Sequence, residues 1–212
     1  MQHLSIENFK CFYNAEIPIN ELTILAGANG NGKSTTIQAL LLLRRTIEHC
    51  SEWKNGYFEY NNINGLNVEL NGVYCLGLGN SENILPAEYD EPKIVLGLKD
   101  NSTGIKIRYN TNKGSELWIT PEKFIENDFK FPQNSLLFQQ FYYLNAERIG
   151  PRIAQSIKFY DYHNVGFRGE YTAQIIADID SLESDENFTV DENRILKDDK
   201  FLKGSKFQHH IN

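Results

Sequence analysis

The hydrophobic and polar positions near the N-terminus change their period twice, and each change predicts a different element. Residues 4–9 alternate between apolar and polar side chains with one shift at Asn8, which is typical of a half-buried strand, and residues 15–19 predict a second short strand. Residues 22–26, LTILA, are apolar almost throughout and suit a central strand buried on both faces. From residue 34 to residue 49 the apolar positions recur near helical spacing without Pro or Gly, so this segment predicts a largely buried helix.

The middle and the end of the chain follow other patterns. Residues 66–120 hold short β-like runs broken by turn signals such as Asn71-Gly72, and they predict an antiparallel meander. Residues 121–127 predict a short helix and residues 136–144 a further strand. Residues 170–182 predict a helix with Ile175, Ile176 and Ile179 on one side. Residues 183–212 have few apolar anchors and predict a polar, partly mobile tail.

The loop between the third predicted strand and the first helix carries the clearest chemistry. It reads GANGNGKS and fits the phosphate-binding pattern G-x-x-x-x-G-K-[ST] at every fixed position. Its glycines allow backbone N–H groups to surround phosphate oxygens, and the following helix adds the positive end of its dipole. The predicted ligands are ATP and Mg²⁺, with Ser34 as the protein ligand of the metal. The predicted binding residues are Gly27, Ala28, Asn29, Gly30, Asn31, Gly32, Lys33, Ser34 and Thr35.

Two alternatives bear on this loop. A chance match in an ordinary glycine turn is disfavoured by the apolar strand before it and the apolar helix after it. Hydrolysis needs a second acid at the end of a buried strand to hold Mg²⁺. The nearest candidates are Asp178 and Asp180 in the run IIADID, which the pattern places in a helix. The sequence therefore predicts nucleotide binding without recognisable groups for hydrolysis.

Composition narrows the class of protein. The 212 residues fit one domain or one large part of a domain, and 41% hydrophobic residues suffice for a core. A net charge of −7 argues against a nucleic-acid binder acting alone. The three cysteines form no CxxC pair, so a zinc site is not expected. No apolar run approaches the length of a membrane span, and with no export signal we expect a cytoplasmic protein without membrane contact.

The segments LSIENFKCF, IPINELTILAGANGNGKST and IQALLLLRR resemble the N-terminus of SMC-, RecF- and Rad50-like ABC-type ATPases. The resemblance is greatest to bacterial AAA-labelled proteins related to OLD-type ATPases of DNA repair and phage defence. Further segments that resemble this group are LNGVYCLGLG, YLNAERIGPR and NVGFRGEYTAQII, so the similarity covers about residues 1–180.

The resemblance implies an α/β fold of the P-loop NTPase class, with an ABC-ATPase-like mixed sheet, an antiparallel β lobe and a small helical segment. Residues 1–180 would form the N-terminal part of a head, and residues 183–212 the tail. Within the head, residues 22–50 would be the phosphate-loop strand and helix, residues 66–145 the β lobe, and residues 146–182 a loop and helix. In such ATPases the hydrolytic motifs follow in the C-terminal half, so this chain would hydrolyse ATP only when completed.

The resemblance also implies partners. Two heads close on ATP, which predicts a second head in a homodimer or higher homo-oligomer, an effector protein, and DNA held through a partner. The alternative is a nucleotide-binding scaffold that does not hydrolyse ATP and that supports a partner effector. A small P-loop kinase or GTPase is a weaker alternative, because no switch segment or N-K-x-D-like motif is found.

Several further residues have two interpretations. By the resemblance, Lys10 borders the adenine or ribose together with its neighbours Cys11 and Phe12; alternatively, Lys10 is a surface residue beside core phenylalanines. The resemblance also implies a glutamine that contacts Mg²⁺ or water, and Gln139 and Gln140 are the candidates for this role. Alternatively, both are ordinary strand or surface residues. The charged residues near Gly150 and Gly169 either have a functional role or form structural Arg–Glu pairs; they are Glu147, Arg148, Arg152, Arg168 and Glu170. The adjacent His209 and His210 are interpreted as part of a solvated chain end.

Overall fold

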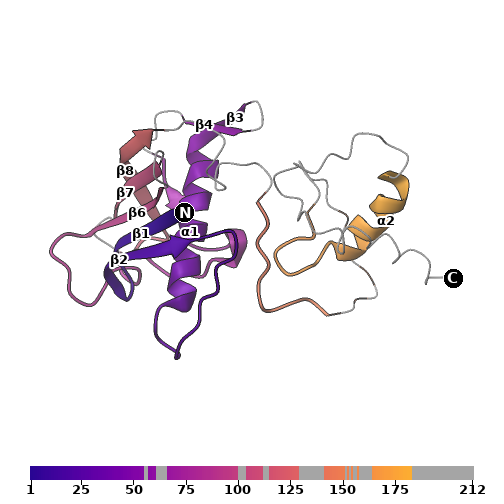
Figure 1. Ribbon diagram of the computed structural model, residues 1–212, viewed down its shortest axis with the longest axis horizontal. Coiled ribbons are helices and arrows are strands. Elements are labelled where there is room, and N and C mark those ends of the chain that lie inside the picture. The colour runs from indigo at the N-terminus through magenta and orange to yellow at the C-terminus, as the bar shows by residue number, and fades with distance from the viewer. Residues whose placement is uncertain are drawn as a thin grey trace.

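One antiparallel sheet and one long helix form the body of the protein (Figure 1). The computed structural model describes residues 1–54, 57–60, 66–99, 104–111, 115–128, 141–150, 152, 154, 157 and 164–182. The six-stranded sheet has the order β2-β1-β6-β7-β8-β5, and every pairing in it is antiparallel. Its strands are β1 (Gln2–Phe9), β2 (Phe12–Ile19), β5 (Val68–Glu69), β6 (Lys93–Lys99), β7 (Gly104–Asn110) and β8 (Trp118–Asp128).

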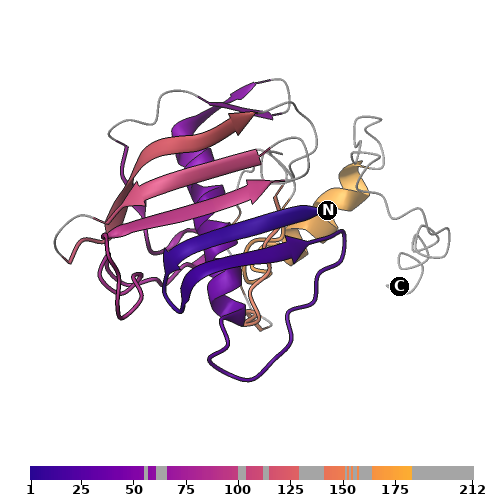
Figure 2. The same ribbon diagram turned by 60° about the vertical axis from the view of Figure 1, so that its left-hand side comes forward.

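Helix α1 (Lys33–Cys50) packs across one face of this sheet, as the turned view in Figure 2 shows. Its buried residues join inward-facing residues of β1, β6 and β7 in one core, including Leu4, Ile6, Leu42 and Ile107. A polar contact lies inside this core, where the Tyr109 hydroxyl donates to Thr46 Oγ1 at 2.9 Å. Thr46 Oγ1 donates its own proton to the Leu42 carbonyl at 2.8 Å, so it accepts from the Tyr109 phenol, whose pKa is raised by burial.

Smaller elements surround the body. Strands β3 (Ser51–Lys54) and β4 (Tyr57–Tyr60) form a two-stranded sheet directly after α1. A short 3₁₀ turn, η1 (Val73–Cys75), follows β5, and helix α2 (Thr172–Leu182) follows the loops that begin at residue 141. These loops contact the body through an aromatic cluster in which the Tyr74 ring lies 5.4 Å from Phe141 and 4.9 Å from Phe167. Among the described residues, no helix is long and apolar enough to cross a membrane.

Much of the predicted secondary structure is confirmed. Strands β1 and β2, helix α1, strands β6 and β7, the first three residues of β8 and helix α2 occur where the hydrophobic pattern places them. Within the predicted meander, residues 73–75 form the 3₁₀ turn η1 and not a strand. The β3–β4 pair was not predicted, because residues 52–64 show little periodicity. The antiparallel part of the expected fold is therefore present, whereas a mixed sheet is not found among the described residues, where all strand pairs are antiparallel.

Three predicted elements are wrong in whole or in part. Residues 22–26 form no strand, and Leu22 and Ile24 are 78% and 79% exposed. A strand buried on both faces needs neighbours, and in the described part of the chain no strand pairs with this run. The predicted helix at residues 121–127 lies instead in β8, where Pro121 pairs with Tyr109 at an irregular register. Such an irregularity accommodates a proline, which cannot donate a ladder hydrogen bond. The predicted strand at residues 136–144 is also absent from residues 141–144, and its first part lies outside the described residues.

Candidate nucleotide site

The glycine loop before α1, residues 27–34, has positive φ angles at three glycines, a feature that phosphate-binding loops use. Gly27, Gly30 and Gly32 have φ angles of +146°, +87° and +81°, values that residues other than glycine rarely adopt. Helix α1 begins at Lys33, and its first helical bond runs from the Thr36 N–H to the Gly32 carbonyl at 2.8 Å. The first N–H groups of an 18-residue helix therefore adjoin the loop, where they favour an anion.

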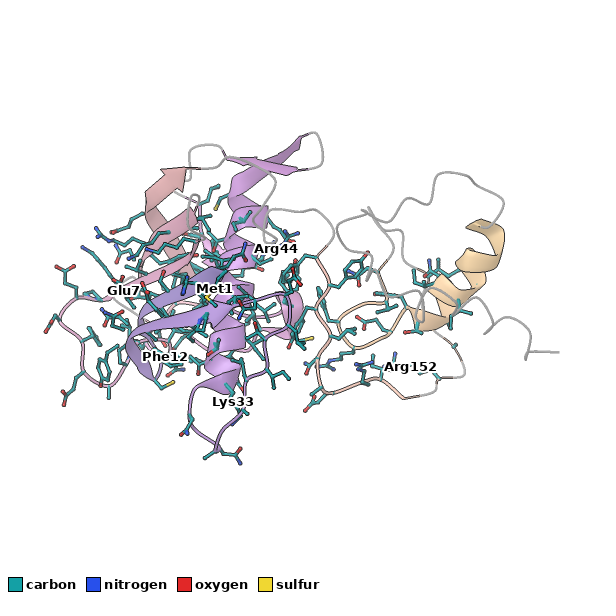
Figure 3. The ribbon with its side chains drawn as sticks, viewed as in Figure 1. Met1, Glu7, Phe12, Lys33, Arg44 and Arg152 are labelled. Atoms are coloured by element: carbon teal, nitrogen blue, oxygen red, sulfur yellow. The ribbon has the colours of Figure 1, made fainter. Side chains whose placement is uncertain are left out.

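Lys33 lies over the start of the same loop. Its ammonium Nζ donates to the carbonyl oxygens of Gly27 at 2.8 Å and Ala28 at 2.7 Å. Figure 3 shows Lys33 at the loop end of α1 and Arg44 farther along the same helix. The two carbonyl contacts hold a positive charge beside the loop N–H groups, and phosphate oxygens could replace these carbonyls as acceptors.

The three hydroxyl residues that follow Lys33 differ in their surroundings. Thr36 is buried, and its Oγ1 donates to the Gly32 carbonyl at 2.9 Å, so it stabilises the helix start. Thr35 is half-buried and its Oγ1 accepts a long contact of 3.7 Å from the Cys11 thiol. Ser34 is exposed, and among the described residues its hydroxyl has no hydrogen-bond partner. Ser34 is therefore the hydroxyl best suited to a Mg²⁺ ion that arrives with nucleotide phosphates.

The turn between β1 and β2 covers one side of the loop. A Cβ placed on Gly32 would lie 2.4 Å from Cζ of Phe12 and 3.1 Å from Sγ of Cys11. Gly32, the second fixed glycine of the motif, is therefore required by close packing as well as by its φ angle. The sequence contains no local signal for this contact, because Gly32 lies about twenty residues from the turn.

Lys10, in the same turn, is held beside α1. Its backbone N–H donates to the Ile84 carbonyl at 2.7 Å, and its Nζ donates to Gln38 Oε1 at 2.9 Å. Burial lowers the pKa of Lys10, while the neighbouring Cys11 raises it. Lys10 thus lies near the first turns of the helix that carries Lys33, and its predicted contact to adenine or ribose stays a prediction.

The charged residues singled out near Gly150 and Gly169 converge on a second cavity. It has a volume of about 850 Å³ and lies between η1, residues 145–152 and the start of α2. Glu147, Arg152, Arg168 and Glu170 line it, whereas Arg148 does not. No Arg–Glu ion pair forms among these four residues; Glu170 accepts the backbone N–H of Arg168 at 2.7 Å instead. The interpretation as structural ion pairs is therefore wrong for these side chains.

The remaining candidates separate into two groups. Asp178 and Asp180 lie in helix α2, as the helical interpretation predicts, and not at the end of a strand. Within the described ranges, no three His, Cys, Asp or Glu residues form a metal-binding group. Gln139, Gln140, His209, His210 and the predicted tail 183–212 lie outside the described residues.

Comparison with known protein families matches residues 1–208 to the AAA ATPase domain. Neither the curated proteins nor the solved structures contain a significant match to the chain. The family match covers the glycine loop, the sheet and the second cavity together.

Proposed function

Because the chain belongs to the AAA ATPase domain family, we propose that it binds ATP with Mg²⁺ at the loop Gly27–Ser34. The observation that carries the proposal is the position of Lys33 Nζ, 2.8 Å and 2.7 Å from two loop carbonyls at the N-terminus of α1. A fixed ammonium, glycines with positive φ and unsatisfied helix N–H groups all favour a polyphosphate over other ligands.

Each group has a defined role in this proposal. The N–H groups of the loop and of the first helical turn donate to the phosphate oxygens, and Lys33 neutralises the β- and γ-phosphates. Ser34 contributes its hydroxyl to Mg²⁺, which supplies further charge neutralisation when bound. Thr35 lies in the first turn of α1 and can donate to a phosphate oxygen. The turn of Lys10, Cys11 and Phe12 would border the remainder of the nucleotide.

We further propose that this ATP-binding unit is one part of an ABC-type head. Leu22 and Ile24 support it, since an apolar run directly before a phosphate loop stays exposed unless other strands cover it. A further polypeptide segment would pair with this run, and two completed heads would close on ATP as a homodimer or higher homo-oligomer. The proposed role in DNA repair or phage defence, with an effector protein or DNA as partner, rests on the resemblance of residues 1–180 to such ATPases.

A scaffold that binds ATP without hydrolysing it is the second candidate. The observation in its favour is that Asp178 and Asp180, the nearest candidates for the second acid, belong to helix α2. A carboxylate that holds Mg²⁺ for hydrolysis is needed at a strand end beside the phosphate loop. The two candidates therefore agree on ATP binding and differ on turnover.

The thiol of Cys11 provides a direct test of the ATP site. Cys11 is exposed and packs beside Gly32 and Thr35, so a bound nucleotide should shield it from alkylation. At a Mg·ATP concentration ten times Kd, we expect labelling of Cys11 by iodoacetamide to slow about tenfold, in proportion to the unliganded fraction. Peptide-resolved mass spectrometry would measure the rate.

Cys50 is the internal control for this experiment. It is buried, and burial raises the pKa of its thiol to about 11, so it should label slowly with or without ATP. Equal Cys11 labelling rates in the presence and absence of saturating Mg·ATP would contradict the proposed site.

Turnover separates the two candidates for function. If the head must be completed by another segment, the 212-residue chain alone should hydrolyse ATP at least about 100-fold below the roughly 1 s⁻¹ lower end of typical enzymes. Phosphate release by the purified chain would be measured, with Lys33→Ala as the background. Turnover near 1 s⁻¹ that depends on Lys33 would contradict the need for completion.

A further inference from the structure

We propose that the second cavity, lined by Arg152 and Arg168, binds the phosphate group of a small phosphorylated molecule. The cavity is separate from the phosphate loop: Lys33 lies on α1, whereas Arg152 lies on the loops between α1 and α2 (Figure 3). The proposal does not rest on ATP binding, and its test is independent of Lys33.

The backbone around the cavity is ordered by hydrogen bonds between two distant segments. The Asn145 N–H donates to the Phe167 carbonyl at 2.8 Å, and the Ile149 N–H donates to the Arg168 carbonyl at 3.0 Å. Between Phe167 and α2 the chain turns through Gly169, with a φ angle of +76°. The two segments thus form a fixed frame that brings Arg152 and Arg168 to one cavity although sixteen positions separate them in sequence.

The acidic side chains of the cavity leave the two guanidinium groups available. The Glu170 carboxylate is held by the Arg168 N–H at 2.7 Å and packs against Gly166, where a Cβ would lie 2.4 Å from Glu170 Cδ. Glu170 also precedes the N-terminus of α2, where a negative charge is favoured. Glu147 is exposed at the rim. Within the described part of the chain, neither Arg152 nor Arg168 has a side-chain ion pair, so both can meet an anion.

Arginine favours a particular kind of anion. The planar guanidinium offers paired N–H donors that match two oxygens of a phosphate, and two such groups in one cavity suit a phosphate monoester dianion. The volume of about 850 Å³ exceeds one phosphate and falls within the range of small-molecule sites. Asn145 and Tyr171 also line the cavity and make its wall partly polar. A nucleic-acid strand is disfavoured, because the chain carries a net charge of −7.

The wall formed by η1 is unusually constrained. Gly72, Tyr74 and Cys75 have φ angles of +97°, +56° and +54°, and for the two residues other than glycine this conformation is unfavourable. Tyr74 is fixed because its hydroxyl donates to the Glu48 carboxylate of α1. Cys75 is half-buried, lines the cavity and is held in place by this constrained backbone. Cys75 is therefore a natural reporter of ligand in this cavity.

The test uses Lys33→Ala protein, in which the phosphate loop is disabled, and follows alkylation of Cys75 by iodoacetamide. The probes are AMP and inorganic phosphate, which distinguish a phosphorylated small molecule from the free anion. We expect AMP to slow Cys75 labelling. Adding Arg152→Gln or Arg168→Gln should raise the AMP concentration for half-protection at least about tenfold, since each removes charge-assisted hydrogen bonds.

Arg148→Gln is the matched control, because Arg148 is an exposed arginine of the same loop that does not line the cavity. It should leave protection by AMP unchanged. Protection by inorganic phosphate alone would reduce the proposal to an anion site and overturn its small-molecule part. The proposal would be wrong if neither probe protects Cys75, if protection survives the double Arg152→Gln, Arg168→Gln change, or if only a 5′-phosphorylated oligonucleotide protects. If the proposed ATP site is wrong instead, Mg·ATP will not slow labelling of Cys11 in protein that retains Lys33, and the Cys75 test is unaffected.

Discussion

Replacing Lys33 by alanine is expected to weaken Mg·ATP binding at least about 100-fold, because two or more charge-assisted hydrogen bonds to phosphate are lost. Among the described residues, the hydrogen bonds of Lys33 Nζ go to the Gly27 and Ala28 carbonyls, and both of these residues are exposed, so their carbonyls can be hydrated. The fold should therefore persist. Isothermal titration calorimetry would measure the affinity, and circular dichroism would check that α1 and the sheet remain.

Lys99→Ala is the matched control for the charge change, since Lys99 is exposed at the end of β6. Its effect on Mg·ATP affinity should be less than about twofold, because exposed charges that do not contact the ligand are strongly screened. Equal affinity of Lys33→Ala and the unchanged protein would refute the assignment of residues 27–34 as a phosphate loop.

The position of the candidate ATP site could be predicted because its determinants are local. Three glycines, Lys33 and Ser34 lie within eight positions, and the helix that follows is fixed by its own apolar spacing. The packing of Phe12 over Gly32 could not be predicted in this way, since it depends on how the β1–β2 turn meets α1. The resemblance placed this turn near the nucleotide, but the spacing of residues did not.

The wrong predictions share one physical cause: the structure of a segment depends on the other segments that it pairs with, and the local pattern does not show these partners. Residues 22–26 have the composition of a central strand, but strand formation requires neighbours, and Ile24 is exposed. Residues 121–127 pair with β7, and this pairing overrides their weak helical pattern. The second cavity depends likewise on the contact of Ile149 with Arg168, between segments that the sequence presents as two unrelated groups of charges.

Replacing Arg44 by alanine should lower the free energy of unfolding by about 2–4 kcal/mol. The Arg44 side chain is 1% exposed, its Nε lies 2.8 Å from Glu48 Oε1, and its Cζ lies 4.9 Å from the ring centroid of Phe141. Alanine leaves Glu48 without its cation and removes a contact to the loops beyond residue 141. This decrease in the free energy of unfolding is at the lower end of the range for broken buried ion pairs, because Glu48 is 22% exposed and keeps the hydrogen bond from Tyr74.

Arg45→Ala is the control variant: it also removes an arginine from α1 but leaves the Arg44–Glu48 pair in place. Arg45 Nη2 lies 3.9 Å from a Glu69 carboxylate that is 68% exposed, so loss of this ion pair should lower the free energy of unfolding by less than about 0.5 kcal/mol. Urea unfolding of both variants would give the free energies, and the double change Arg44→Met, Glu48→Gln should recover part of the stability by removing both charges. If Arg44→Ala costs no more than Arg45→Ala, the Arg44–Glu48 pair does not stabilise the fold. The loops beyond residue 141 would then be held to η1 by the Tyr74–Phe141 contact, and η1 to α1 by the hydrogen bond from Tyr74 to Glu48.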